Sequence, residues 1–127
     1  KLRKKAGSFK KATKKIAASL YKARSLEERL KVLMEKWNLR LPTATAILTI
    51  LYPKDFTVYD IRAREQLGFD RIREDYSAKH WNAMWASYLR FKDTVVKKTP
   101  LDLCLRDKDR YLWGKSLFED AELDWRG

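Results

Sequence analysis

The stretch NLRLPTATAILTIL, residues 38–51, decides the fold of this chain of 127 residues. Pro42 suits the first turn of a helix, because its ring fixes the backbone angle that a helix needs there. The residues that follow are small and apolar on nearly every side, so residues 43–51 are expected to form a helix at the buried centre of the fold. The break at residues 38–41 then leaves a short turn between this helix and the one before it.

Helical signals continue on both sides of this stretch. Ser25 and Glu28 form a capping box that opens a helix with a leucine-rich apolar stripe. Asp60 is a good N-cap for a helix over residues 61–67, which Gly68 ends. A long helix is expected from Ser77 to about residue 98. Its core-facing side carries the aromatic stripe Trp81, Met84, Trp85, Tyr88 and Phe91.

Two further helices are expected near the C-terminus, a short one over residues 101–105 and a last one capped by Asp107. Polar and apolar residues do not alternate over any run long enough to predict a sheet. The predicted fold class is therefore all-α, a compact bundle of about six or seven helices around residues 43–51.

The charge is concentrated at the N-terminus. The net charge is +12, and residues 1–24 supply ten basic side chains and no acidic one, whereas the remaining 103 residues have a net charge of only +2. We therefore divide the chain into a basic N-terminal helix or arm (1–24), a helical domain (25–118) and an acidic tail (119–127). The basic segment is expected either to neutralise phosphates or to be a solvated helix face. The lysines that carry the first interpretation are Lys10, Lys11, Lys14 and Lys15.

Composition excludes several classes of site. A single cysteine and a single histidine rule out a zinc or iron–sulfur site built on several thiolates, so we expect no metal and no cofactor. No apolar run approaches the roughly 18 residues needed to span a bilayer, so no membrane partner is expected. The strong basic excess favours nucleic acid as the partner. A cytoplasmic location is expected, nucleoid-associated if the partner is DNA.

Residues 38–68 resemble the helix-hairpin-helix DNA glycosylase superfamily, in particular a branch of small uncharacterised bacterial proteins. The family pattern reads Gly-hydrophobic-Gly-x-Lys-Thr-Ala-x-Ala-Ile-Leu, then Val-Asp, and ends in Leu-Gly. Asn38 and Arg40 stand where the family has its two hairpin glycines, and Pro42 stands on the lysine of the bifunctional members. Asp60 falls on the catalytic aspartate, 18 residues after Pro42. The residues that match directly are Leu39, Thr43, Ala44, Ala46, Ile47, Leu48, Leu67 and Gly68.

A second stretch supports the resemblance. LRDKDRYLW, residues 105–113, is similar to an Arg-Asp-x-Asp-Arg-x-Leu-Trp segment that follows the hairpin and aspartate in those small bacterial proteins. The resemblance covers residues 25–117. It implies a fold like a reduced helix-hairpin-helix glycosylase core.

The resemblance implies that the chain binds DNA, most naturally a double strand. Backbone amides of the 38–43 hairpin would hold a phosphate at a helix N-terminus. A glycosylase of this family flips a nucleotide out and cleaves its N-glycosidic bond, with Asp60 as the carboxylate. Because Pro42 replaces the lysine nucleophile, an active enzyme would be monofunctional. The implied nucleic-acid contacts are Asn38, Leu39, Arg40, Leu41, Thr43, Lys10, Lys11, Lys14, Lys15, Arg62 and Arg64.

Two alternatives stay open at this point. An aspartate at a helix start is by default an N-cap, which would make Asp60 a structural residue. The whole chain would then be a catalytically inactive helical scaffold that binds a protein or RNA partner through the same surfaces. The charge pattern by itself does not separate DNA from RNA.

Overall fold

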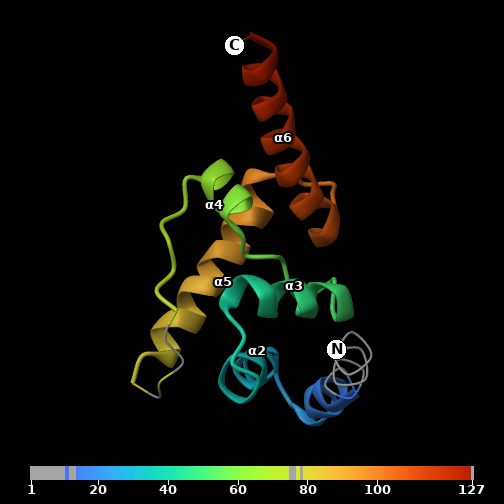
Figure 1. Cartoon of the computed structure of the whole chain (residues 1–127), viewed down its shortest axis with the longest axis vertical. Helices are drawn as coiled ribbons and strands as arrows, with labels where there is room; N and C mark the ends of the chain where they lie inside the picture. The colour runs from blue at the N-terminus through green and yellow to red at the C-terminus, as the bar shows by residue number, and fades with distance from the viewer. Residues whose placement is uncertain (1–10, 12–13, 75–76, 78, 127) are drawn as a thin grey trace, which may run out of the picture. The chain divides into compact units, whose positions relative to one another are not determined.

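The computed structural model describes residue 11 and residues 14–74, 77 and 79–126. These residues form helices and connecting segments with no strand, which confirms the all-α prediction (Figure 1). The chain consists of two units, residues 1–39 and 40–127, and each is described on its own. This boundary lies within the stretch predicted as a hairpin. The sequence divides the chain after Arg24 because the net charge changes there, whereas the structure divides it after Leu39 because the two units are separately compact.

In the described part of the first unit, helical residues 14–22 are followed by α2 (Leu26–Lys31) and the π-helical turn η1 (Val32–Lys36). The predicted cap at Ser25 is confirmed, because its hydroxyl accepts a hydrogen bond from the Glu28 backbone N–H at 3.1 Å. The Glu28 carboxylate in turn accepts from the Arg24 N–H at 2.8 Å. The buried side chains of this unit include Leu20, Leu30, Leu33 and Met34.

The second unit contains α3 (Leu41–Leu51), α4 (Ile61–Leu67), α5 (Trp81–Lys98) and α6 (Leu105–Arg126). Helix α6 packs on α4 and α5, and its C-terminal part projects past the other helices of this unit (Figure 1). The aromatic stripe of α5 is buried as predicted at Trp81, Met84, Tyr88 and Phe91, while Trp85 is partly exposed. Phe91 makes edge-to-face contacts with Tyr59 and Phe69, so α5 supplies much of the core.

Several predictions about the elements were wrong in detail, and one of them is the start of the long helix, which begins at Trp81 and not at Ser77. Helix α3 is buried on one face only, since Ile50 is 74% exposed and Leu51 48% exposed. Residues 101–104 form a turn and not a helix, and α6 begins at Leu105, so Asp107 lies inside its first turn. Helix α6 also continues through the predicted acidic tail to Arg126, because neither proline nor glycine interrupts residues 115–126.

Candidate nucleic-acid interface

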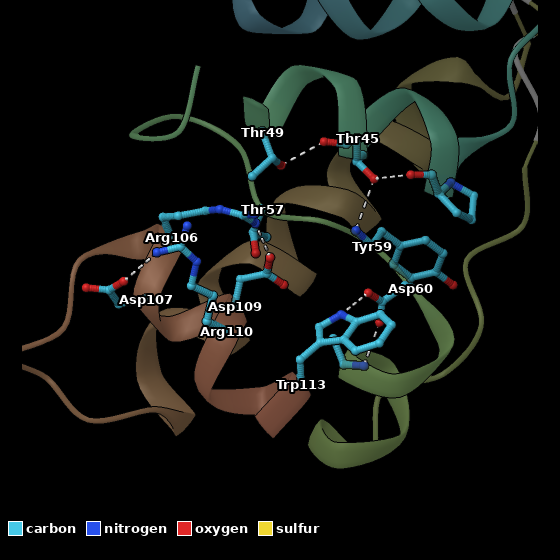
Figure 2. A network of polar contacts seen from close by, with 12 residues as sticks. Thr45, Thr49, Thr57, Tyr59, Asp60, Arg106, Asp107, Asp109, Arg110 and Trp113 are labelled. Carbon is cyan, nitrogen blue, oxygen red and sulfur yellow. Dashed lines mark hydrogen bonds and ion pairs between the residues drawn. The ribbon is translucent and has the colours of Figure 1, made fainter. Parts of the chain in front are cut away.

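The extended segment 56–60 carries Asp60, and buried side chains of two helices hold it in place. The Thr45 hydroxyl on α3 accepts a hydrogen bond from the Tyr59 N–H at 3.0 Å (Figure 2). It also donates one to the Leu41 carbonyl at 2.8 Å. On α5, the Tyr88 hydroxyl accepts from the Thr57 N–H at 3.1 Å and donates to the Thr57 carbonyl at 2.8 Å. Burial raises the pKa of Tyr88 well above its usual range, so this hydroxyl keeps its proton.

Asp60 is the N-cap of α4. One of its carboxylate oxygens accepts a hydrogen bond from the Ala63 N–H at 2.7 Å. The other accepts from the indole N–H of Trp113 on α6, so Asp60 links the two helices (Figure 2). Gly68 ends α4 in the left-handed conformation, with φ of 63°. These are the contacts of a structural cap, one of the two roles that the sequence leaves open.

Asp60 also lines an open pocket of about 390 Å³ in the second unit. The pocket brings together four residues that the sequence singles out, Arg40, Thr43, Asp60 and Arg64. It adds Arg71, which sequence reasoning missed because it lies in an irregular stretch. The remaining lining residues are Pro42, Tyr59, Ile61 and Glu74.

The arginines of this pocket differ in their partners. Arg40 forms an ion pair with Glu74 at 3.3 Å. Among the residues that the structure describes, Arg64 and Arg71 have no carboxylate within ion-pair distance. Arg71 is exposed and Arg64 partly exposed. Two guanidinium groups at one pocket therefore lie without an ion-pair partner among the described residues, although the carboxylates of Asp60 and Glu74 line the same pocket.

The N-terminus of α3 is already bound to an acidic side chain. The Glu74 carboxylate accepts a hydrogen bond from the Leu41 N–H at 2.5 Å, and its other oxygen accepts from the Arg40 guanidinium. Pro42 has no N–H to offer. One of the backbone amides that the hairpin resemblance implies for a phosphate, that of Leu41, thus binds a carboxylate of this same chain. The Leu41 side chain is fully buried, so the expected contact of Leu41 with nucleic acid is not available to its side chain.

The other residues of the predicted hairpin belong to the first unit. Asn38 adopts a left-handed backbone with φ of 54°, the conformation that the family's glycine would permit and that asparagine tolerates. Asn38 is exposed and Leu39 is partly exposed. Arg40 has φ of −78°, so this position does not require a glycine.

Arg62 contacts α6 and does not line the pocket. Its guanidinium donates hydrogen bonds to Asp120 at 2.7 Å and to the Ser116 hydroxyl at 3.0 Å. It also lies over the Trp113 ring, 5.4 Å from the ring centroid. Arg62 therefore holds α4 against α6, in addition to any role toward a ligand.

The predicted lysines lie in the first unit. Lys11, Lys14 and Lys15 are exposed, and Lys10 lies outside the described residues. An open groove of about 630 Å³ runs beside the helical residues 14–22. Its lining combines three lysines with apolar surface, as follows: Lys15, Lys22, Lys36, Ala18, Val32, Trp37 and Ser19.

The charged run at the start of α6 makes two ion pairs within the helix. Arg106 pairs with Asp109 at 2.8 Å and Arg110 with Asp107 at 3.4 Å. Asp109 is buried, and this burial, followed by the nearby charge of Asp60, raises its pKa to about 6. Lys108 is also buried, and its ammonium donates to the carbonyl of Pro100 at 2.6 Å. This cluster anchors α6 to the end of α5.

Comparison of the chain with models of known protein families, with curated proteins and with solved structures gives no match. Within the described residues, no three histidine, cysteine, aspartate or glutamate side chains are grouped so that they could hold a metal ion. None of the described helices is both long and apolar enough to cross a membrane.

Proposed function

We propose that this chain binds double-stranded DNA through its phosphate backbone, without reading base sequence. The observation that carries the proposal is the pocket of the second unit, where Arg64 and Arg71 lie without a carboxylate partner among the described residues. Guanidinium groups suit phosphate because they donate several hydrogen bonds in one plane. Contacts of this kind position a protein on the duplex and carry no sequence information.

The lysine groove of the first unit supports the same proposal independently. Lys15, Lys22 and Lys36 line this groove, and Lys11 and Lys14 are also exposed. Ammonium groups act as point charges, so they add affinity that depends on salt and not on sequence. Affinity at each surface is expected to come mainly from counterion release.

The test is fluorescence anisotropy with a labelled duplex at several salt concentrations. Each phosphate contact contributes about 0.9 to the slope of log K against log salt. Arg64→Ala and Arg71→Ala should each lower that slope by about one and weaken binding equally for unrelated duplex sequences. Lys97→Ala is the matched control, because it removes one exposed charge outside the pocket. Equal slopes for all three variants would contradict the proposal.

A second candidate is monofunctional DNA N-glycosylase activity, favoured by the place of Asp60 on the wall of this pocket. A carboxylate there would stabilise the positive charge that develops on the sugar. Asparagine is also a good N-cap, so Asp60→Asn keeps the helix start while removing the charge. We expect base release from duplexes with deaminated, alkylated or oxidised bases to be lost in Asp60→Asn, with binding retained. No release by the wild type from any of these duplexes would reject the enzyme and leave the binding proposal standing.

A further inference from the structure

The π-helical turn η1 forms part of the lysine groove in the first unit. Its hydrogen bonds join residues five apart, and the Trp37 N–H accordingly donates to the Val32 carbonyl at 3.3 Å. In an α-helix, with about 3.6 residues per turn, Val32 and Trp37 would point about 140° apart. The wider π turn brings them toward one side, and both line the groove. π-Helical turns are rare and occur frequently at functional sites.

The lysine groove carries positive charge without an ion-pair partner. Lys15, Lys22 and Lys36 line it, and no carboxylate of the described residues lies within ion-pair distance of any of them. The Lys36 ammonium donates to the Ser19 hydroxyl at 3.2 Å, which joins η1 to the helical residues 14–22. Residues 1–39 contain 13 basic and only three acidic side chains. An occupant of the groove is therefore expected to be an anion.

Two glutamates restrict where such an anion lies. An adjoining hollow of about 570 Å³ shares two of the lysines with the groove, but Glu28 and Glu35 line it as well. Their carboxylates would repel an anion. Lys15 and Trp37 line the groove and not this hollow. The anion is therefore expected on the side of Lys15 and Trp37.

The groove also offers aromatic and apolar surface, which a phosphate backbone by itself does not use. Trp37, Val32 and Ala18 lie among the lysines of its lining, and Trp37 is partly exposed. Lysines beside an aromatic ring suit a single strand, because the phosphates meet the charges while an unpaired base stacks on the ring. In a duplex the bases stack on one another, so the ring would find no free base.

We propose that the lysine groove binds single-stranded DNA, with an unpaired base stacked on Trp37 and neighbouring phosphates held by the three lysines. The π turn, the ammonium groups without carboxylate partners and the aromatic ring in one groove select this ligand. The inference rests on the proposed DNA binding and deepens it, because it assigns the unpaired strand to the first unit.

The experiment is fluorescence anisotropy of the full chain with two labelled probes, a duplex and an oligothymidylate of about 12 nucleotides. The wild type should bind both probes. Trp37→Leu should weaken binding of the oligothymidylate about tenfold, because it removes one base–aromatic stack, and leave duplex binding within about twofold. Trp85→Leu is the matched control, at another partly exposed tryptophan outside the groove, and it should bind both probes like the wild type.

Two further variants separate lost stacking from lost folding. Trp37→Phe keeps an aromatic ring, so it should retain most of the affinity for the oligothymidylate, and circular dichroism should show the helix content of the wild type. Lys15→Ala removes an exposed charge and should lower the slope of log K against log salt by about 0.7 on this probe.

The outcomes distinguish this inference from the proposed function. A wild type that binds the duplex but not the oligothymidylate overturns the single-strand inference alone, and a wild type that binds neither probe overturns both proposals. Equal losses on the two probes for Trp37→Leu, or an unchanged salt slope for Lys15→Ala, would also reject the groove as the single-strand site.

Discussion

Replacing Tyr88 by phenylalanine should destabilise the second unit by about 3 kcal/mol. The Tyr88 hydroxyl is the hydrogen-bond partner of both the N–H and the carbonyl of Thr57, and both residues are fully buried. Removing it breaks two hydrogen bonds and leaves two buried backbone groups without a partner. Each buried group left in this way costs about 1–3 kcal/mol. The sum of these two costs is a large part of the free energy of unfolding of a whole domain, which is roughly 5–15 kcal/mol.

Thr57→Val is the matched control at the other end of the same contact. The Thr57 side-chain oxygen is buried and has no hydrogen-bond partner among the described residues. Valine of nearly the same shape should therefore leave stability unchanged or raise it slightly. The assay is urea unfolding followed by tryptophan fluorescence, with equal m-values as the check that only stability has changed. A loss below about 0.5 kcal/mol for Tyr88→Phe, or a larger loss for Thr57→Val, would refute the reasoning.

Three further predictions follow from the site. Asp60→Ala should lower the free energy of unfolding by more than about 1 kcal/mol, because it removes the acceptors of both the Ala63 N–H and the Trp113 indole N–H, and Asp60→Asn should lower it by less, because asparagine keeps the acceptor for Ala63 alone; urea titrations check this. Asp109 has a folded pKa of about 6 against roughly 3.9 when unfolded, so the native state holds its proton more tightly. The bound proton therefore stabilises the native state below pH 4, and this stabilisation is lost as the pH rises to 6. Asp109→Asn should gain stability relative to the wild type over this interval, which urea unfolding at each pH measures. Glu74→Gln should tighten duplex binding about two- to fivefold in anisotropy titrations, because it removes a negative charge from the wall of the proposed phosphate site while keeping an acceptor for the Leu41 N–H.

The sequence predicts those parts of this fold that depend on neighbours along the chain. Ser25 and Asp60 cap their helices as expected, and Gly68 ends α4 with a left-handed backbone. Such caps satisfy amides within three residues, so a short window of sequence contains the whole interaction. The aromatic stripe of α5 is predictable for the same reason, since helical periodicity marks its buried face.

The site is less predictable because its contacts join residues far apart in the sequence. Leu41 and Glu74 are 33 residues apart, and Thr57 and Tyr88 are 31 apart. Asp60 meets Trp113 across 53 residues. Nothing local in the sequence indicates that a carboxylate from the irregular stretch after α4 caps α3. Arg71 was missed because it lies in an irregular stretch. The apolar type of its neighbour Ile72 is a sequence sign that this stretch packs against the core, and Ile72 is indeed buried.

The N-terminus of α3 changes what the hairpin resemblance can mean for this chain. In that resemblance, glycines let the backbone approach a phosphate and the helix amides hold it. Here Arg40 stands at one glycine position, and the Leu41 amide binds Glu74. The Leu41 amide is therefore not open to a phosphate and Pro42 has no amide N–H, and positive side chains at the same pocket are a further means of attraction. We infer that any phosphate affinity of the second unit comes from guanidinium groups, Arg64 and Arg71 foremost. Binding of that origin follows salt concentration closely and base sequence hardly at all.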